Sequence, residues 1–228
     1  MVTVAVIPAR GGSKRIPKKN MIDFGGFPLI FQTIRTAIDS NMFDQVIVST
    51  DDLDTAEFAE KIGATVPGLR ELFNDDEATS SNVTTYEIDR YFKNNNVLPN
   101  FVYQLMPTCP FRTINDLRSV ERFLANNEDR SVITCHTLVG GNAWWASTID
   151  HNFAPKFLFP EKLKTRSQDL PPIYVPNGAI WASKVSLLKM YESFHNPTVS
   201  FFNIPWLSGL DIDTPEDLEI AQSLISRV

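Results

Sequence analysis

Cysteine and histidine are scarce in this 228-residue sequence, and neither is arranged to build a cofactor site. The two cysteines, Cys109 and Cys135, are too few for a disulfide framework. No Cys-x-x-Cys pair or Cys/His cluster is present, so a zinc site is not expected. We therefore expect reduced thiols and a cytoplasmic protein.

The sequence also lacks long apolar runs and an excess of positive charge. No run of about 18 apolar residues occurs, and basic residues follow the first apolar segment instead of preceding it, so neither a membrane span nor a signal peptide is expected. The formal net charge is −6, from 21 Lys and Arg against 27 Asp and Glu. Because an acidic chain binds nucleic acid and anionic membranes poorly, we expect neither as a partner.

Apolar runs instead alternate with amphipathic segments along most of the chain. The predicted strands cover residues 2–8, 45–50, 65–66, 101–106, 131–135, 178–182 and 199–205, and the predicted helices cover 28–40, 54–61, 80–93, 113–126, 185–192 and a last segment from Pro215. This alternation predicts a single α/β domain over residues 1–228 with a mainly parallel sheet. It stops between residues 138 and 175, a segment too long for a simple loop. We expect an inserted lobe there, able to cover a site or pair with another subunit.

The sharpest motif directly follows the first predicted strand, at residues 8–20 (Pro-Ala-Arg-Gly-Gly-Ser-Lys-Arg-Ile-Pro-Lys-Lys-Asn). Gly11 and Gly12 permit backbone geometry in which successive N–H groups converge on an anion. Five cations lie within ten residues: Arg10, Lys14, Arg15, Lys18 and Lys19. The spacing matches neither the P-loop nor the dinucleotide fingerprint. A loop at the carboxyl end of a sheet strand lies where α/β folds bind ligands, which favours a phosphate site over a solvated basic loop.

A second motif, Asp211-Ile212-Asp213-Thr214-Pro215-Glu216-Asp217, combines two carboxylates with a helix start. Asp211 and Asp213 lie two apart, so in extended backbone they project to the same face. Two carboxylates on one face suit Mg²⁺. The alternative is helix capping, which explains Thr214 and Asp217 but leaves Asp211 unexplained. Phosphate-binding cations together with a magnesium site indicate phosphoryl or nucleotidyl transfer.

The motif at residues 7–20 resembles the signature of the acylneuraminate cytidylyltransferases, also called CMP-sialic acid synthetases. Four further matches follow in the family's order, at residues 48–52, 107–112, 176–180 and 211–214. The resemblance implies a Rossmann-like nucleotidyltransferase fold, as in nucleotide-diphospho-sugar transferases, and a homodimer in which residues 138–175 form the dimerisation lobe. It implies a Mg²⁺-dependent enzyme that transfers CMP from CTP to the anomeric hydroxyl of a nonulosonic acid of the N-acylneuraminate type, releasing pyrophosphate.

The resemblance also implies roles for single residues. Lys19, Arg10 and Asp211 are expected to act in catalysis, with Lys19 stabilising charge on the α-phosphate. The residues expected to contact the nucleotide are Ala9, Arg10, Gly11, Gly12, Ser13, Lys14, Lys19, Arg70 and Ser80. Asp211 and Asp213 are expected to hold Mg²⁺. Three residues are expected to contact the sugar acid: Gln104, Arg166 and Asn177.

Departures from the sialic-acid pattern leave more than one sugar acid possible as the substrate. Met106 stands where sialic-acid enzymes carry Gln, and Gln104 lies two residues earlier on the same strand face. Residues 140–145 replace a His-Pro-Leu-Lys type segment, and residues 165–170 resemble pseudaminic acid cytidylyltransferases. The alternatives are therefore a CMP-pseudaminic or CMP-legionaminic acid synthetase, an enzyme for an eight-carbon acid, or a non-catalytic nucleotide-binding member of the fold.

Overall fold

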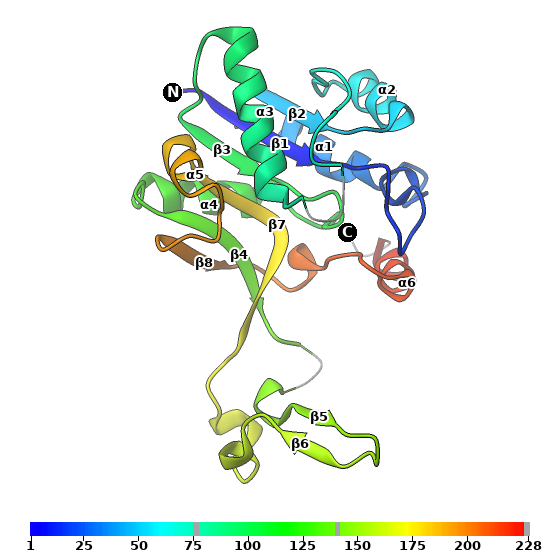
Figure 1. Ribbon diagram of the computed structural model, residues 1–228, viewed down its shortest axis with the longest axis vertical. Helices are drawn as coiled ribbons and strands as arrows, with labels where there is room; N and C mark the ends of the chain where they lie inside the picture. The colour runs from blue at the N-terminus through cyan, green and yellow to red at the C-terminus, as the bar shows by residue number, and fades with distance from the viewer. Residues whose placement is uncertain (75–77, 140–141, 226–228) are drawn as a thin grey trace.

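The computed structural model describes residues 1–74, 78–139 and 142–225, so the Gly140-Gly141 pair of the insert lies outside the described residues. A six-stranded sheet forms the centre of the main body, in the order β2-β1-β3-β7-β4-β8 (Figure 1). Its strands are β1 (Thr3–Pro8), β2 (Gln45–Ser49), β3 (Phe101–Gln104), β4 (Ser131–Thr137), β7 (Tyr174–Lys184) and β8 (Val199–Asn203).

The sheet is mainly parallel, as the sequence predicts. β1 pairs in parallel with β2 and β3, and β4 pairs in parallel with β8. β7 alone runs antiparallel, between β3 and β4. It returns directly from the inserted lobe, and a parallel pairing would need a crossover connection instead. The strand predicted at residues 65–66 is reduced to one bridge between Thr65 and Ile47, because the following Pro67 has no N–H to continue a ladder.

The described residues form six α-helices, each within a few residues of a predicted one. They are α1 (Ile30–Asp39), α2 (Leu53–Lys61), α3 (Ser80–Asn95), α4 (Ile114–Ala125), α5 (Val185–Tyr191) and α6 (Pro215–Leu224). The predicted capping box of α6 is present: Thr214 accepts from the Asp217 N–H, and Asp217 accepts from the Thr214 N–H. None of the helices in the described part of the chain is long and apolar enough to cross a membrane.

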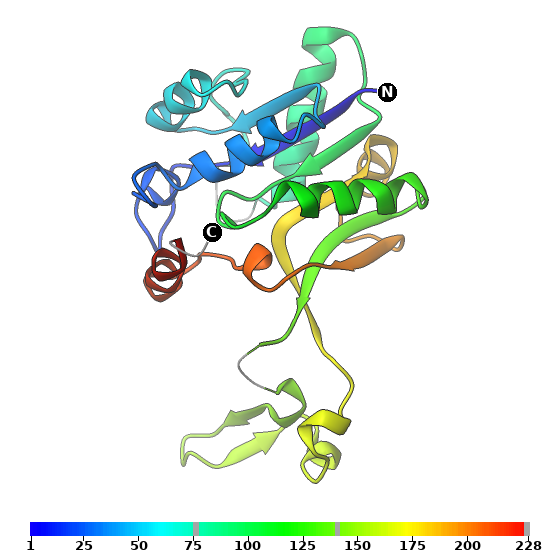
Figure 2. The same ribbon diagram turned by 180° about the vertical axis from the view of Figure 1, so that it is seen from behind.

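Both faces of the sheet are covered, which explains the unbroken apolar run of β1. Ala5 and Ile7 belong to one core cluster, packed with α1 and α4, whereas Val4 and Val6 belong to a second, packed with α3 and α5. Figure 1 shows α3 and α5 on one face of the sheet, and Figure 2 shows α1 and α4 on the other. A strand buried on both faces needs apolar residues at every position.

The segment between β4 and β7 forms a lobe that projects away from the main body in both views (Figures 1 and 2). It holds a hairpin of β5 (Ser147–Ile149) and β6 (Pro155–Phe157), with short 3-10 turns on either side. No residue in the described part of the lobe, 142–173, is buried. Large apolar side chains at the hairpin face solvent instead, with Ile149 65% and Phe153 82% exposed. In a single chain the lobe therefore has no buried core.

Candidate active site

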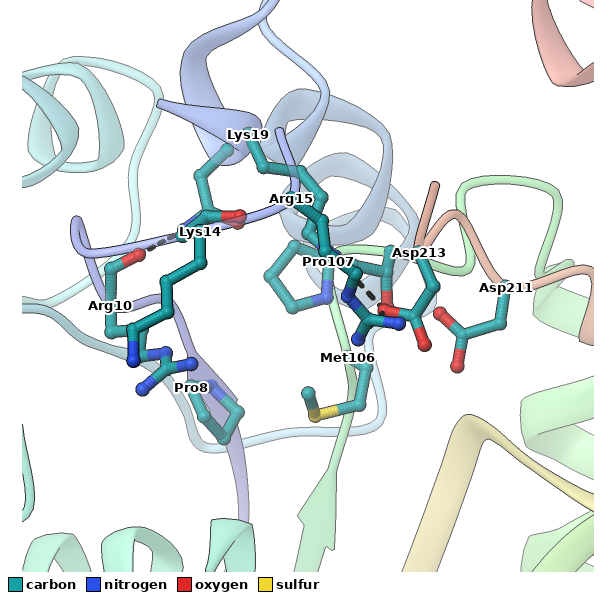
Figure 3. A pocket seen from close by; sticks show the side chains of 12 residues that line it. Pro8, Arg10, Lys14, Arg15, Lys19, Met106, Pro107, Asp211 and Asp213 are labelled. Atoms are coloured by element: carbon teal, nitrogen blue, oxygen red, sulfur yellow. Dashed lines mark hydrogen bonds and ion pairs between the residues drawn. The ribbon is translucent and has the colours of Figure 1, made fainter. Parts of the chain in front are cut away.

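A cavity of about 600 Å³ opens at the carboxyl ends of β1 and β3. Its walls come from the glycine-rich loop after β1, from residues 106–108 after β3, and from the segment before α6. Arg10 and Lys14 face Asp211 and Asp213 across it, with Met106 between them (Figure 3). The two sequence motifs, nearly 200 residues apart, therefore form one site.

The glycine-rich loop is held to the end of β2 by its own backbone. The Gly11 N–H donates to Asp51 Oδ1 at 2.7 Å, and the Ala9 N–H donates to the Ser49 carbonyl at 2.8 Å. A Cβ at Gly11 would lie 2.9 Å from Asp52 Cβ, so only glycine permits this approach. The N–H groups of Ala9 and Gly11 are therefore bound to protein acceptors, and a contact of the Gly12 N–H with an anion stays a prediction. The Ser13 side chain lines the cavity from the same loop.

Four of the five clustered cations line the cavity: Arg10, Lys14, Arg15 and Lys19. The exception is Lys18, whose Nζ pairs with Asp54 on α2 at 2.9 Å. Lys18 also has φ of 51°, a left-handed turn that separates its direction from that of its neighbour Lys19. Lys18 therefore fits the solvated-loop interpretation, whereas the other four cations line the cavity in which the phosphate site is predicted.

Lys19 joins the loop to the carboxylate segment. Its Nζ donates to the Ile212 carbonyl at 2.9 Å and to Asp213 Oδ1 at 3.2 Å. Arg15 Nη2 lies 3.1 Å from the same Asp213 oxygen. The Lys19 side chain is only 13% exposed, so its charge is less screened by water than that of Lys14 or Lys18 on the same loop.

Asp211 is half-buried, and one of its carboxylate oxygens is buried and unused. Among the described residues, Asp211 Oδ1 has no hydrogen-bond partner. Burial raises the pKa of Asp211, and the charge of Asp213 adds to this effect, against an opposing hydrogen bond from Thr108. A buried oxygen of this kind is costly unless a cation compensates it.

The two carboxylates fit a magnesium ion that is shared with a substrate. No group of three or more His, Cys, Asp or Glu side chains that would enclose a metal exists within residues 1–74, 78–139 and 142–225. Mg²⁺ commonly binds through one or two carboxylates plus substrate phosphates and water. Asp211 and Asp213 supply that number of hard oxygen ligands, next to the cations that line the cavity.

A smaller hollow of about 230 Å³ adjoins the main cavity and shares Pro8, Arg10 and Met106 with it. Arg70 and Ser80, both predicted at the nucleotide, line this hollow together with Phe73 and Val83. Arg70 is buried, and its Nη1 donates to the Ser49 carbonyl at 3.0 Å. The hollow thus combines apolar walls with one fixed guanidinium.

The three residues predicted at the sugar lie in different places. Gln104 is fully buried and bonded to Thr84 and Ser80, so it supports the cavity wall from behind instead of lining it. Asn177 lines a third hollow of about 300 Å³ that shares Asp211 with the main cavity. Arg166 lies on the lobe, where it pairs with Asp169 at 2.7 Å, and it lines none of the three hollows.

Residues 4–148 match the family model described as cytidylyltransferase. This chain belongs to the cytidylyltransferase family. It is 34% identical to the pseudaminic acid cytidylyltransferase of Campylobacter jejuni, over 98% of this chain and 96% of that protein. It is 33% identical to the CMP-N,N'-diacetyllegionaminic acid synthase of Legionella pneumophila, over 99% and 97% of the two chains. It is 30% identical to the N-acylneuraminate cytidylyltransferase of Streptococcus agalactiae, over 95% of this chain and 52% of that protein.

Solved structures confirm the predicted nucleotidyltransferase fold of this cytidylyltransferase. A CMP:2-keto-3-deoxy-manno-octonic acid synthetase complexed with CTP matches 100% of this chain and 99% of its own, with a TM-score of 0.70 at 20% identity. A 4-diphosphocytidyl-2C-methyl-D-erythritol synthase from Anaerococcus prevotii matches 99% of each chain, with a TM-score of 0.62 at 18% identity.

The cytidylyltransferase cavity also contains residues that the sequence reasoning did not place there. Arg15 belongs to the five clustered cations but has no predicted role in the site, although it pairs with Asp213. Asn20 closes the loop by donating from Nδ2 to the Arg10 carbonyl at 3.0 Å. Thr108 lines the cavity after β3. Arg15 and Asn20 lie inside the motif and Thr108 inside a matched segment, so proximity to the motifs was the available signal.

Proposed function

We propose that this cytidylyltransferase transfers CMP from CTP to the anomeric hydroxyl of a nonulosonic acid and releases pyrophosphate. The observation that carries the proposal is the single cavity that joins four cations of the glycine-rich loop to Asp211 and Asp213. Full-length likeness to enzymes named for pseudaminic and legionaminic acid supports the sugar class. A cytoplasmic location, where CTP is available, is part of the proposal.

The nucleotide is proposed to span two adjoining hollows. The triphosphate lies in the main cavity against Arg10, Ser13, Lys14 and Lys19, whose charges and hydroxyl offset its negative charge. The base lies in the smaller hollow beside Arg70, because Arg10 and Met106 border both spaces. This placement brings the α-phosphate toward Lys19, which stabilises the charge that develops during transfer.

Asp211 and Asp213 are proposed to hold Mg²⁺. When bound, Mg²⁺ neutralises phosphate charge and lowers the pKa of the attacking hydroxyl. The acceptor is proposed to enter through the third hollow, which meets the main cavity at Asp211. Asn177 is held rigidly there, since its Oδ1 accepts from Thr134 at 2.7 Å and from the Ala179 N–H at 3.1 Å.

Incubation with CTP, Mg²⁺ and a panel of sugar acids tests the proposed reaction. The panel is pseudaminic, legionaminic and N-acetylneuraminic acid, with the eight-carbon acid of the related synthetases as control. We expect pyrophosphate release with a nine-carbon acid, abolished by EDTA and absent with UTP. CTP binding without pyrophosphate release for any acid would contradict the proposal and favour a non-catalytic nucleotide-binding protein.

We further propose a homodimer held by the lobe of residues 138–175. None of the described lobe residues is buried in the single chain. The apolar side chains of Ile149, Phe153 and Leu158 are 65%, 82% and 57% exposed. An apolar surface of this kind is typical of a protein interface. Arg166 cannot line the cavity of its own chain from this lobe, so any sugar contact it makes belongs to the site of the second copy.

Introducing charge at the hairpin tests the dimer. We expect Phe153→Asp combined with Ile149→Asp to convert a dimer into a monomer in light scattering after gel filtration. The matched control is Met190→Asp, which places a charge at a 70% exposed apolar residue on α5 of the main body and leaves the dimer intact. A wild-type monomer, or a dimer that survives the double substitution, would contradict the lobe interface.

A further inference from the structure

We propose that Glu87, on α3 and outside the cavities, positions Arg70 to recognise the acceptor edge of cytosine. Glu87 acts through two partners, Ser49 on β2 and Arg90 on α3. The proposal rests on the proposed function, since it takes CTP as the nucleotide. It makes Glu87 a positioning residue, not a catalytic one.

Arg70 is fixed on one side of its guanidinium. Nη1 donates to the Ser49 carbonyl at 3.0 Å and to Ser49 Oγ at 3.2 Å, and Nε donates to Asn74 Oδ1 at 2.9 Å. Within the described part of the chain, Nη2 has no hydrogen-bond partner. Because Arg70 lines the base hollow, the remaining N–H groups are available to a ligand there.

Glu87 fixes the direction in which the Ser49 hydroxyl points its proton. Ser49 Oγ donates to Glu87 Oε1 at 2.6 Å. A serine hydroxyl has one proton, so this bond leaves only lone pairs facing Arg70. The hydroxyl is thereby held as an acceptor for Nη1. Without the carboxylate, the Ser49 proton is free to turn toward Arg70 and oppose its binding.

Glu87 also supports the backbone that leads into Arg70. Arg90 Nη1 lies 3.1 Å from Glu87 Oε1. Arg90 Nη2 donates to the carbonyls of Pro67 and Gly68. Gly68 has φ of +110°, so the chain turns there before it reaches Arg70. One carboxylate therefore holds both the head of Arg70, through Ser49, and its backbone, through Arg90.

The burial of Glu87 indicates more than a packing role. Glu87 is fully buried, and burial raises the pKa of its carboxyl against the opposing effects of Ser49, Arg90 and Arg70. Replacing a buried ion pair with apolar residues is often neutral or stabilising, so stability alone does not require a charge here. A charge at this position instead balances Arg90 and Arg70, and it orients Arg70, which lines the base hollow.

The free N–H groups of Arg70 match cytosine better than uracil. Cytosine presents two adjacent acceptors, O2 and N3, whereas uracil carries a donor at N3. A donor that meets a donor leaves both buried groups unpaired, which is the strongest source of discrimination between similar ligands. Correct placement of Arg70 is therefore expected to set the preference for CTP over UTP.

Calorimetric titration with CTP and UTP, in the absence of any sugar, tests the positioning role. We expect Ser49→Ala and Glu87→Gln each to weaken CTP binding about tenfold and to change UTP binding less than about twofold. Glu121→Gln is the matched control, because Glu121 pairs with Arg118 at the same i,i+3 spacing on the exposed surface of α4. That variant is expected to bind both nucleotides as the wild type does.

A double variant separates positioning from general stability. In an Arg70→Ala background, Ser49→Ala is expected to cause no further loss of CTP affinity, because its effect passes through Arg70. A further loss in that background, or an equal loss for CTP and UTP in the single variants, would overturn the proposal.

If Glu87→Gln does not fold, the result for Ser49→Ala decides the test, since that variant leaves the Glu87–Arg90 pair intact. A wild type without preference for CTP would contradict the proposed function instead, whereas a selective wild type with unchanged variants would contradict only the positioning role.

Discussion

Asp211→Asn is expected to lower kcat about a thousandfold and to leave the fold intact. The substitution removes one of the two carboxylates proposed to hold Mg²⁺, whose electrostatic contribution to transfer is worth several kcal/mol, and about 4 kcal/mol corresponds to a thousandfold in rate. Pyrophosphate release under saturating CTP measures the loss. Titration of CTP binding with Mg²⁺ supplies a second readout, in which the variant is expected to lose most of the Mg²⁺ dependence.

Stability distinguishes this effect from simple damage. Burial raises the folded-state pKa of Asp211 above 3.8, the value expected in the unfolded chain. The charged form is therefore disfavoured in the folded protein, and Asp211 reduces stability as pH rises above about 4. Asparagine carries no charge, so we expect the melting temperature of the variant at pH 7 to equal or exceed that of the wild type.

A matched control is available on the surface. Asp54 is an exposed carboxylate that pairs with Lys18 outside the cavity, so Asp54→Asn is expected to retain wild-type turnover. An Asp211→Asn protein that keeps full activity, or one that melts far below the wild type, would show that Asp211 is not a metal ligand.

Local patterns predicted much of this fold because their causes are local. The apolar run of β1 reflects burial on both faces of one strand, and the capping box of α6 involves residues three apart. The glycine-rich loop and the pair Asp211 and Asp213 were recognisable because their spacing alone constrains their chemistry. The meeting of these two motifs in one cavity followed from the sheet topology and the family resemblance.

The features that escaped sequence analysis depend on distant partners. Lys18 and Lys19 are adjacent and chemically identical, yet one pairs with Asp54 on α2 and the other with Asp213 before α6. The sequence predicts Gln104 and Met106 on one strand face, but β3 ends at Gln104, whose side chain is bonded to α3 while Met106 lines the cavity. Glu87 looks like an ordinary helix-surface acid, and only the packing of α3 against the sheet buries it beside Ser49. No local spacing records such contacts.

Lys19→Ala is expected to lower kcat about a hundredfold and to raise the KM for CTP only a few fold. The Lys19 side chain is 13% exposed and lies between the glycine-rich loop and the carboxylates, where charge on the α-phosphate is proposed to develop. An interaction that strengthens in the transition state affects kcat more than ground-state binding. Steady-state pyrophosphate release at varied CTP separates the two parameters.

The fold is expected to tolerate this change, because Asp213 keeps its ion pair with Arg15 at 3.1 Å when Lys19 is removed. Lys18→Ala is the matched control: it removes the neighbouring charge of the same loop, but from a side chain that is 70% exposed and paired with Asp54. That variant is expected to stay within about twofold of the wild type in kcat and KM. An unchanged kcat with a raised KM in Lys19→Ala would make Lys19 a ground-state phosphate ligand. Equal losses in both lysine variants would instead show that the loop responds to its total charge, and the position of Lys19 beside Asp213 would then have no special part in transfer.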